Sequence, residues 1–179
     1  MKIKSGVVAL ILAMTTCSAS AHNKNLEKYG DIAQFGIPLT AGAISLYKGD
    51  TEGLFQLAEG ALYTAVATHA IKFSVNAERP NGGDHSFPSG HTSAATQGAA
   101  YLQFRYGWEY GVPAYAAAAL VGYSRVDSKH HYWRDVVAGA ALATGIQYVV
   151  SEMGYSMSNY VISPYVKGDE VGLYASINF

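Results

Sequence analysis

The chain has 179 residues, which is enough for one domain of ordinary size. Apolar residues make up 50% of it and charged residues 14%, so the composition excludes a disordered chain. The net charge is −1, and no overall positive field favours binding to nucleic acid. We expect a single folded domain without a nucleic-acid partner.

The first 21 residues have the pattern of a secretory signal peptide. Two lysines precede an apolar run at residues 7–13, and Ala19-Ser20-Ala21 matches a small-residue cleavage site. The alternative is an uncleaved anchor, but the apolar run is short for a membrane span. Cleavage after Ala21 would remove Cys17 and leave a mature domain, 22–179, with neither disulfides nor a thiolate metal site. We therefore expect export to the periplasm or to the periplasmic face of a membrane.

Apolar segments separated by turn residues predict five helices in the mature domain. They cover residues 32–47, 51–75, 89–106, 113–123 and 131–153. The polar residues 22–30 are expected to form an irregular arm. Pro38 should kink or interrupt the first helix, and Asp50 or Thr51 should cap the second.

Residue types also predict the connections between the helices. Two prolines and two glycines indicate a loop over residues 76–88. Gly107 and Gly111 are expected to bracket a short connection, with Pro113 in the first turn of the fourth helix. Residues 124–130 are expected to form a polar connection between the last two helices.

The C-terminal residues change character. The runs 161–165 and 171–179 are short and β-prone, and apolar residues alternate with others in the second run. This pattern predicts a β-hairpin over about 160–179, packed on the helices or on a partner. The expected fold class is all-α, a bundle of five to six helices over about 31–155 with this short hairpin at its end.

Three blocks of polar residues interrupt the apolar surroundings at the predicted helix ends. They are Lys72 to Pro80, Phe87 to Thr92, and Ser124-Arg125 followed by His131 and Asp135. A phosphate dianion needs cations around its oxygens, and Arg79 and Arg125 offer planar forks for them, with Lys72 as a point charge. Ser89 and Gly90 would add backbone N–H groups at a helix N-terminus, where the helix dipole favours anions.

The same blocks contain groups for phosphoryl transfer. A neutral imidazole can attack phosphorus if its other nitrogen holds the proton, and a carboxylate can fix that tautomer. His131 and Asp135 are four residues apart, so we expect them on one face of a helix. His91 can protonate the leaving oxygen as a general acid. No compact acidic cluster is present to hold a metal, and no cofactor is expected.

The pattern Lys-x6-Arg-Pro, Pro-Ser-Gly-His and Ser-Arg-x5-His-x3-Asp resembles the type 2 phosphatidic acid phosphatase superfamily. That family includes membrane lipid phosphatases, bacterial class A acid phosphatases and vanadium haloperoxidases. The resemblance implies a helical bundle and a metal-independent phosphatase with a phosphohistidine intermediate. It places the nucleophile on His131, the orienting acid on Asp135 and the general acid on His91. The implied phosphate ligands are Lys72, Arg79, Ser89, Gly90 and Arg125.

Several alternatives stay open at this point. His130 adjoins His131, but it lies five residues from Asp135 and off its helix face. The substrate is a phosphorylated small molecule or lipid: a soluble ester, phosphatidylglycerophosphate, an isoprenyl diphosphate or a lipid A phosphate. A vanadate-dependent haloperoxidase and an inactive envelope binding protein are the other candidate functions. We expect a periplasmic enzyme, globular or bound at a membrane surface, with an integral protein as the alternative and the oligomeric state open.

Overall fold

The structure, a computed structural model, describes residues 23–167 and 170–177. The predicted signal peptide, the tip of the hairpin and the last two residues lie outside the described part. Within it the chain forms five α-helices, a short 3-10 helix and two strands. The helices are α2 (Lys24–Tyr47), α3 (Thr51–Val75), α4 (Gly90–Tyr106), α5 (Trp108–Asp127) and α6 (Trp133–Ser151). The expected all-α bundle with a terminal hairpin is confirmed.

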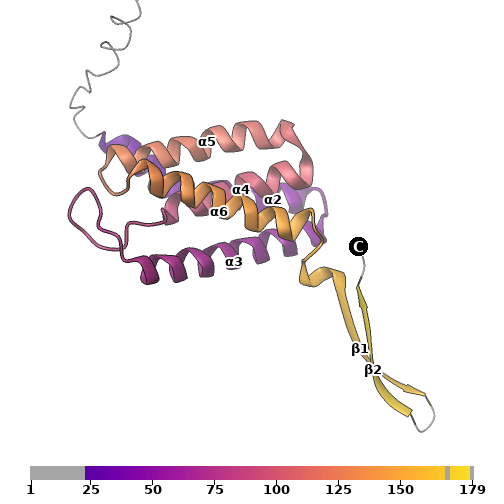
Figure 1. Ribbon diagram of the computed structural model, residues 1–179. Helices are drawn as coiled ribbons and strands as arrows, with labels where there is room; N and C mark the ends of the chain where they lie inside the picture. The colour runs from indigo at the N-terminus through magenta and orange to yellow at the C-terminus, as the bar shows by residue number, and fades with distance from the viewer. Residues whose placement is uncertain (1–22, 168–169, 178–179) are drawn as a thin grey trace, which may run out of the picture.

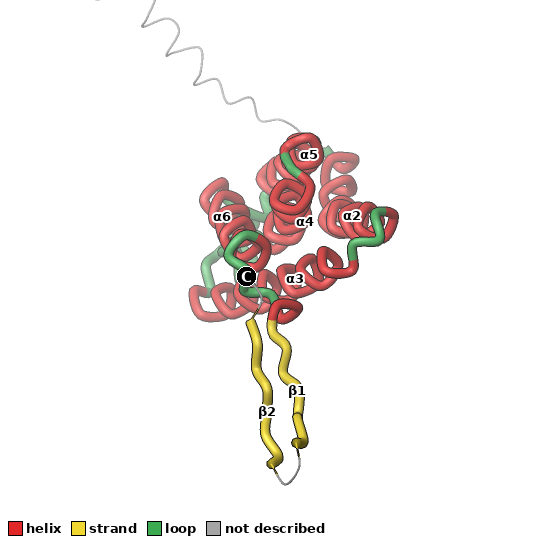
Figure 2. Tube along the Cα trace, turned by 90° about the vertical axis from the view of Figure 1, so that its right-hand side faces the viewer, coloured by secondary structure: helices red, strands yellow, loops and turns green. Residues whose placement is uncertain are grey.

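α4 is the central helix of the bundle. Figure 2, a view along the helices, shows α4 with α2, α3, α5 and α6 arranged around it. Almost every residue of α4 from Thr92 to Leu102 is buried, and most of them are small. The close approach is clearest at Gly98, where a Cβ atom would lie 2.7 Å from the backbone of Pro38 on α2. Small residues thus let the surrounding helices pack tightly on α4.

α2 begins earlier than predicted. The expected irregular arm over residues 22–30 is wrong, because Asn23 caps the helix by accepting hydrogen bonds from the N–H groups of Asn25 and Leu26. The first turns are also held against α5, where Tyr29 donates to the carbonyl of Ala117 at 3.1 Å. The helix continues through Pro38 without interruption. Tertiary contacts therefore order a segment whose composition alone indicated a loop.

α3 and α4 match their predicted bounds, but α5 does not. Asp50 caps α3, and Ser89 caps α4. α5 starts at Trp108 and continues to Asp127, so the predicted connection around Gly111 and the polar connection from residue 124 are both wrong. Gly111 lies inside α5, and the position requires glycine because an added Cβ atom would lie 2.6 Å from the Cβ of Gln103. This glycine serves helix packing and not a turn.

The C-terminal hairpin leaves the bundle at the end of α6. After the 3-10 helix η1 (Met157–Asn159), β1 (Tyr160–Lys167) pairs antiparallel with β2 (Glu170–Ile177). Glu59 of α3 holds the start of this segment by accepting from the Ser156 hydroxyl at 2.7 Å. Figures 1 and 2 both show the strands extending away from the helices. The predicted hairpin is confirmed. In the described residues its strands do not pack on the helices of this chain, so packing on a partner stays a prediction.

The helices also differ from ordinary soluble ones at their surface. Many large apolar side chains are exposed, among them Phe35, Leu39, Leu62 and Val66, each more than half accessible. By length and apolarity, none of the helices described here qualifies as a membrane span.

Candidate active site

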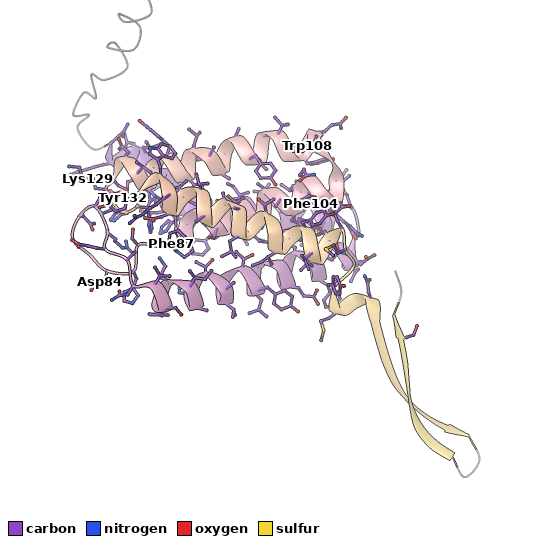
Figure 3. All side chains as sticks on the ribbon, in the orientation of Figure 1. Asp84, Phe87, Phe104, Trp108, Lys129 and Tyr132 are labelled. Atoms are coloured by element: carbon purple, nitrogen blue, oxygen red, sulfur yellow. The ribbon has the colours of Figure 1, made fainter. Side chains whose placement is uncertain are left out.

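The polar blocks of the sequence meet at one end of the bundle. In Figure 3 this is the end of the bundle where Asp84, Phe87, Lys129 and Tyr132 are labelled; Phe104 and Trp108 mark the opposite end. The loop after α3, the start of α4, the end of α5 and the start of α6 converge there (Figure 1). A cavity of about 740 Å³ opens among them and continues between α2 and α3. Its charged end is lined by Lys72, Arg79, His91, Arg125, His130 and His131.

His131 lies in the connection before α6, because that helix begins at Trp133. The prediction that His131 and Asp135 share a helix face is therefore wrong, although the two side chains are adjacent. His131 Nδ1 is 3.7 Å from Asp135 Oδ2, which is an ion-pair distance and longer than a hydrogen bond. His131 is only 3% exposed, and Asp135 is fully buried. With Nδ1 turned to Asp135, Nε2 is the ring nitrogen available to the cavity.

Asp135 is held by its surroundings. As the third residue of α6, it accepts a hydrogen bond from the backbone N–H of Tyr132 at 2.9 Å. Ser86 donates its hydroxyl to the same Asp135 oxygen at 2.5 Å, and the Ser86 Oγ is 3.5 Å from His131 Nδ1. Ser86 is fully buried and links the carboxylate to the imidazole. Sequence reasoning missed Ser86, which lies directly before the block Phe87 to Thr92; this position was the available signal.

Burial and positive charge keep the His131 imidazole neutral. Burial lowers its pKa to about 4, and the charges of Lys72 and Arg79 act in the same direction. The charge of Asp135 and a hydrogen bond in which the Ser86 backbone carbonyl accepts from the imidazole oppose this shift. A neutral imidazole has a free lone pair, so His131 has the protonation state that a nucleophile requires.

Arg125 is the most buried cation of the site. It lies in the last turn of α5 with its side chain 3% exposed. Its guanidinium donates to Asp31 Oδ1 at 2.7 Å and to the carbonyl of Glu27 at 2.6 Å, both on α2. Gly30 makes this approach possible, since any side chain there would overlap the Arg125 guanidinium and the Ser124 hydroxyl. The polar residues at 124 and 125 thus belong to a helix that faces α2.

Asp31 also contacts His91. The Asp31 carboxylate lies 3.2 Å from His91 Nε2, so one oxygen serves both Arg125 and His91. Burial lowers the pKa of His91, the charge of Arg125 lowers it further, and Asp31 raises it. Sequence reasoning missed Asp31 because the residues before it were expected to be irregular. Glu27 and Asp31 are four residues apart, and this spacing places them on one face only when both belong to a helix.

The remaining predicted ligands divide into two groups. Lys72 and Arg79 line the cavity, where Lys72 donates to the carbonyl groups of His85 and Pro88 at 2.6 and 2.9 Å. Burial lowers the pKa of Lys72. Gly90 also lines the cavity. Ser89 lies behind this wall, with its N–H bonded to the Asp135 carbonyl and its hydroxyl accepting from Thr92, so its role as a phosphate ligand stays a prediction.

His130, the rival of His131, has different partners. Its Nε2 lies 2.8 Å from the Glu27 carboxylate, and its Nδ1 is 3.4 Å from the amide of Asn81. Both ring nitrogens are thereby occupied at the rim of the cavity. In the part of the chain that the structure describes, no three His, Cys, Asp or Glu side chains form a group that could hold a metal ion.

Comparisons with known proteins identify the family to which the chain is similar. The model of the PAP2 superfamily matches residues 62–156. A lipid A 4'-phosphatase of Helicobacter pylori is 28% identical, over 96% of this chain and 93% of its own length. A lipid A 1-phosphatase of Porphyromonas gingivalis is 38% identical, over 52% of this chain and 21% of its own length.

Two solved structures share the fold. The crystal structure of Aquifex aeolicus LpxE superposes with a TM-score of 0.62 at 22% identity, covering 75% of this chain and 90% of that one. A transmembrane PAP2-type phosphatidylglycerolphosphate phosphatase from Bacillus subtilis gives a TM-score of 0.60 at 20% identity, covering 85% and 88%. At these identities the likeness establishes the arrangement of the helices.

Proposed function

Because this chain belongs to the PAP2 superfamily, we propose that it is a lipid phosphatase that works through a phosphohistidine at His131 and without a metal ion. The observation that carries the proposal is the neutral, buried His131 at the head of a cavity lined by Lys72, Arg79 and Arg125. Three cations around one nucleophile form a cradle for a phosphate group and not for a neutral ligand. Ser86 and Asp135 lie on the Nδ1 side of the His131 ring and set its orientation.

In the first step, the lone pair of His131 Nε2 attacks phosphorus, and the bond from phosphorus to the leaving oxygen breaks. The three cations stabilise the charge on the equatorial oxygens. Asp135 stabilises the positive charge that develops on the imidazole, whose Nδ1 keeps its proton. The product is a phosphohistidine and an alkoxide that needs a proton.

His91 supplies that proton and takes it back in the second step. A dianionic phosphate brings negative charge next to His91, which favours the protonated imidazole and offsets the lowering of its pKa by burial and Arg125. A water molecule then attacks the phosphohistidine, gives its proton to His91 and breaks the N–P bond. Inorganic phosphate leaves, and His131 is again neutral.

The substrate we propose is a phosphate monoester of an envelope lipid, with lipid A first. The Helicobacter pylori lipid A 4'-phosphatase matches nearly the whole chain, and the exposed apolar side chains of α2 and α3 flank the cavity. Such side chains suit a site that meets its substrate at a membrane. We further propose that the signal segment directs the enzyme to the periplasmic face.

Phosphate release from the purified protein tests the proposal. We expect release from lipid A and from a chromogenic monoester, unaffected by a chelator and inhibited by vanadate. His131→Ala should lower the rate by about a thousandfold or more, because the nucleophile is lost. The adjacent His130→Ala is the matched control and should retain most of the activity. Turnover at the wild-type rate in His131→Ala would refute the mechanism, and loss of activity with the chelator would refute its metal independence.

A further inference from the structure

The cavity is larger than a phosphate group requires. Beyond the cations it continues between α2 and α3 as far as Gln97 of α4, with a total volume of about 740 Å³. This volume lies within the range of roughly 300–1,000 Å³ that is typical of pockets for drug-sized ligands. The inner part of the cavity therefore has room for the group to which the phosphate is attached.

Two threonines line this inner part. Thr64 and Thr68 are four residues apart, and Lys72 follows four residues later, so the three lie on one face of α3 with about 6 Å along the helix axis between each and the next. Both threonines are 3% exposed. Among the residues that the structure describes, neither of their hydroxyl groups has a hydrogen-bond partner.

Other hydroxyl groups in these helices are satisfied by their own helix. Thr40 donates to the carbonyl of Gly36 at 2.7 Å, Ser45 to that of Ala41 at 3.1 Å, and Ser74 to that of Ala70 at 2.8 Å. Thr64 and Thr68 make no such bond. A buried hydroxyl without a partner costs free energy, and native proteins keep few of them. Two such hydroxyl groups on one wall of the cavity indicate a ligand that forms hydrogen bonds with them.

The other walls of the inner cavity are mostly apolar. Phe35 and Pro38 of α2 and Ala61 and Ala65 of α3 contribute carbon surface. A hydroxyl group can donate and accept, so the complementary ligand carries hydroxyl or amide groups on the side that faces Thr64 and Thr68. On the side that faces α2, the same ligand must present a surface that can pack against apolar side chains. A prenyl chain has no group to offer the threonines and would leave both unpaired.

We propose that Thr68 and Thr64 bind hydroxyl or amide groups of a sugar that carries the scissile phosphate. These residues would then select glycolipid phosphates over phosphates of prenyl alcohols. A sugar ring carries hydroxyl or amide groups on neighbouring carbons and can offer partners to both side chains, which are about 6 Å apart along the helix axis. This inference rests on the proposed lipid phosphatase activity and names the chemistry of its leaving group.

The test compares two substrates in the same detergent micelles: lipid A and a prenyl monophosphate. Thr64→Val and Thr68→Val remove the hydroxyl groups at nearly constant volume. We expect each variant to lower kcat/KM for lipid A by about three- to tenfold, as for the loss of one hydrogen bond. The value for the prenyl monophosphate should stay within about twofold, since that substrate makes no such bond. Thr40→Val, at an exposed position on α2, is the matched control and should change neither.

A second measurement separates this role from a structural one. Because neither hydroxyl group has a partner in the described part of the protein, both variants should unfold at a temperature equal to or above that of the wild type. A lower midpoint, equal losses on both substrates or unchanged kcat/KM for lipid A would overturn the inference. If the wild type releases phosphate from neither lipid, it is the proposed function that fails.

Discussion

At the scale of single residues, the site depends on a histidine kept neutral by its neighbours. Burial and two nearby cations keep the His131 imidazole neutral. Its orientation is set by the Asp135 carboxylate, which is itself held by hydrogen bonds from the Ser86 hydroxyl and the Tyr132 N–H. The types and spacing of the motif residues predicted that His131, Asp135 and the cations belong to one site. The structure brings them together at one end of the bundle, and their roles stay predictions. Ser86 and Asp31 were not predictable in this way, because their roles arise from contacts between segments 49 and 94 residues apart.

NMR titration of the His131 ring tests its charge state. The pKa in the folded protein is about 4, against 6.5 for an unperturbed histidine. Since the folded pKa is the lower one, the unfolded chain binds the extra proton between these values, and this group's contribution to stability falls as the pH falls from 6.5 toward 4. Lys72→Met should raise the pKa of His131 by removing a positive charge. A ring that protonates near pH 6.5 in the wild type would contradict this account.

For His91, the general acid that we propose, Asp31 should set the pH range of activity. Its carboxylate raises the pKa of His91, so Asp31→Asn should lower that pKa. Because the general acid must hold its proton, the alkaline limb of kcat/KM against pH should then move to lower pH. Glu52→Gln, which changes a carboxylate far from the cavity, serves as the control. An alkaline limb that stays in place in Asp31→Asn would exclude this role.

At the scale of elements, the helix ends determine where the chemistry lies. α5 continues to Asp127 and α6 begins at Trp133, which leaves His131 in a short connection between them. The sequence predicted the number and order of the helices because their apolar segments are long. It misplaced the boundaries near Gly111 and Ser124, because glycine and polar residues are also typical of turns. Here Gly111 lies at a close contact between helices, and Ser124 lies on a helix face that packs against another helix.

The contact of α6 with the start of α4 can be tested at Gly139. A Cβ atom there would lie 2.7 Å from the carbonyl oxygen of Ser89 and 2.9 Å from the Ser93 hydroxyl. Gly139→Ala should therefore lower the free energy of unfolding by about 1–3 kcal/mol, through overpacking, and reduce activity by displacing the segment that carries His91. Chemical denaturation and phosphate release measure the two effects.

Gly145 in the same helix provides the control. A Cβ atom there meets nothing within 4 Å. Gly145→Ala should raise the free energy of unfolding by about 0.5–1 kcal/mol and leave activity unchanged, because alanine is the better helix former. Equal effects of the two substitutions would show that packing at Gly139 does not position the site.

At the scale of the whole molecule, the bundle presents an apolar exterior around a charged cavity. Leu39 on α2 and Leu62 on α3 are 72% and 59% exposed and lie on the two helices that flank the cavity. Burial of such side chains in lipid is favourable by about 25 cal/mol per Å², whereas the net charge of −1 gives little attraction to anionic lipid. The exterior and the cavity together support our proposal that the enzyme takes its substrate from a membrane.

Sedimentation with lipid vesicles tests this arrangement. We expect the protein to bind vesicles of neutral lipid, to resist release by high salt and to be released by detergent. The double variant Leu39→Ser/Leu62→Ser should bind more weakly, and Thr40→Ser, at an exposed polar position, should bind as the wild type does. Release of the wild type by salt alone would show that charge and not apolar contact holds it.

The central claim, that phosphate passes through His131, is tested most directly by trapping the intermediate. A radiolabelled phosphate ester with a good leaving group is mixed with His91→Gln and quenched in alkali, in which an N–P bond survives. Loss of the base for the second step should let the phosphoenzyme accumulate, and mass spectrometry should locate the label on His131. Label on another residue, or the same label in the additional variant His131→Ala, would contradict the mechanism.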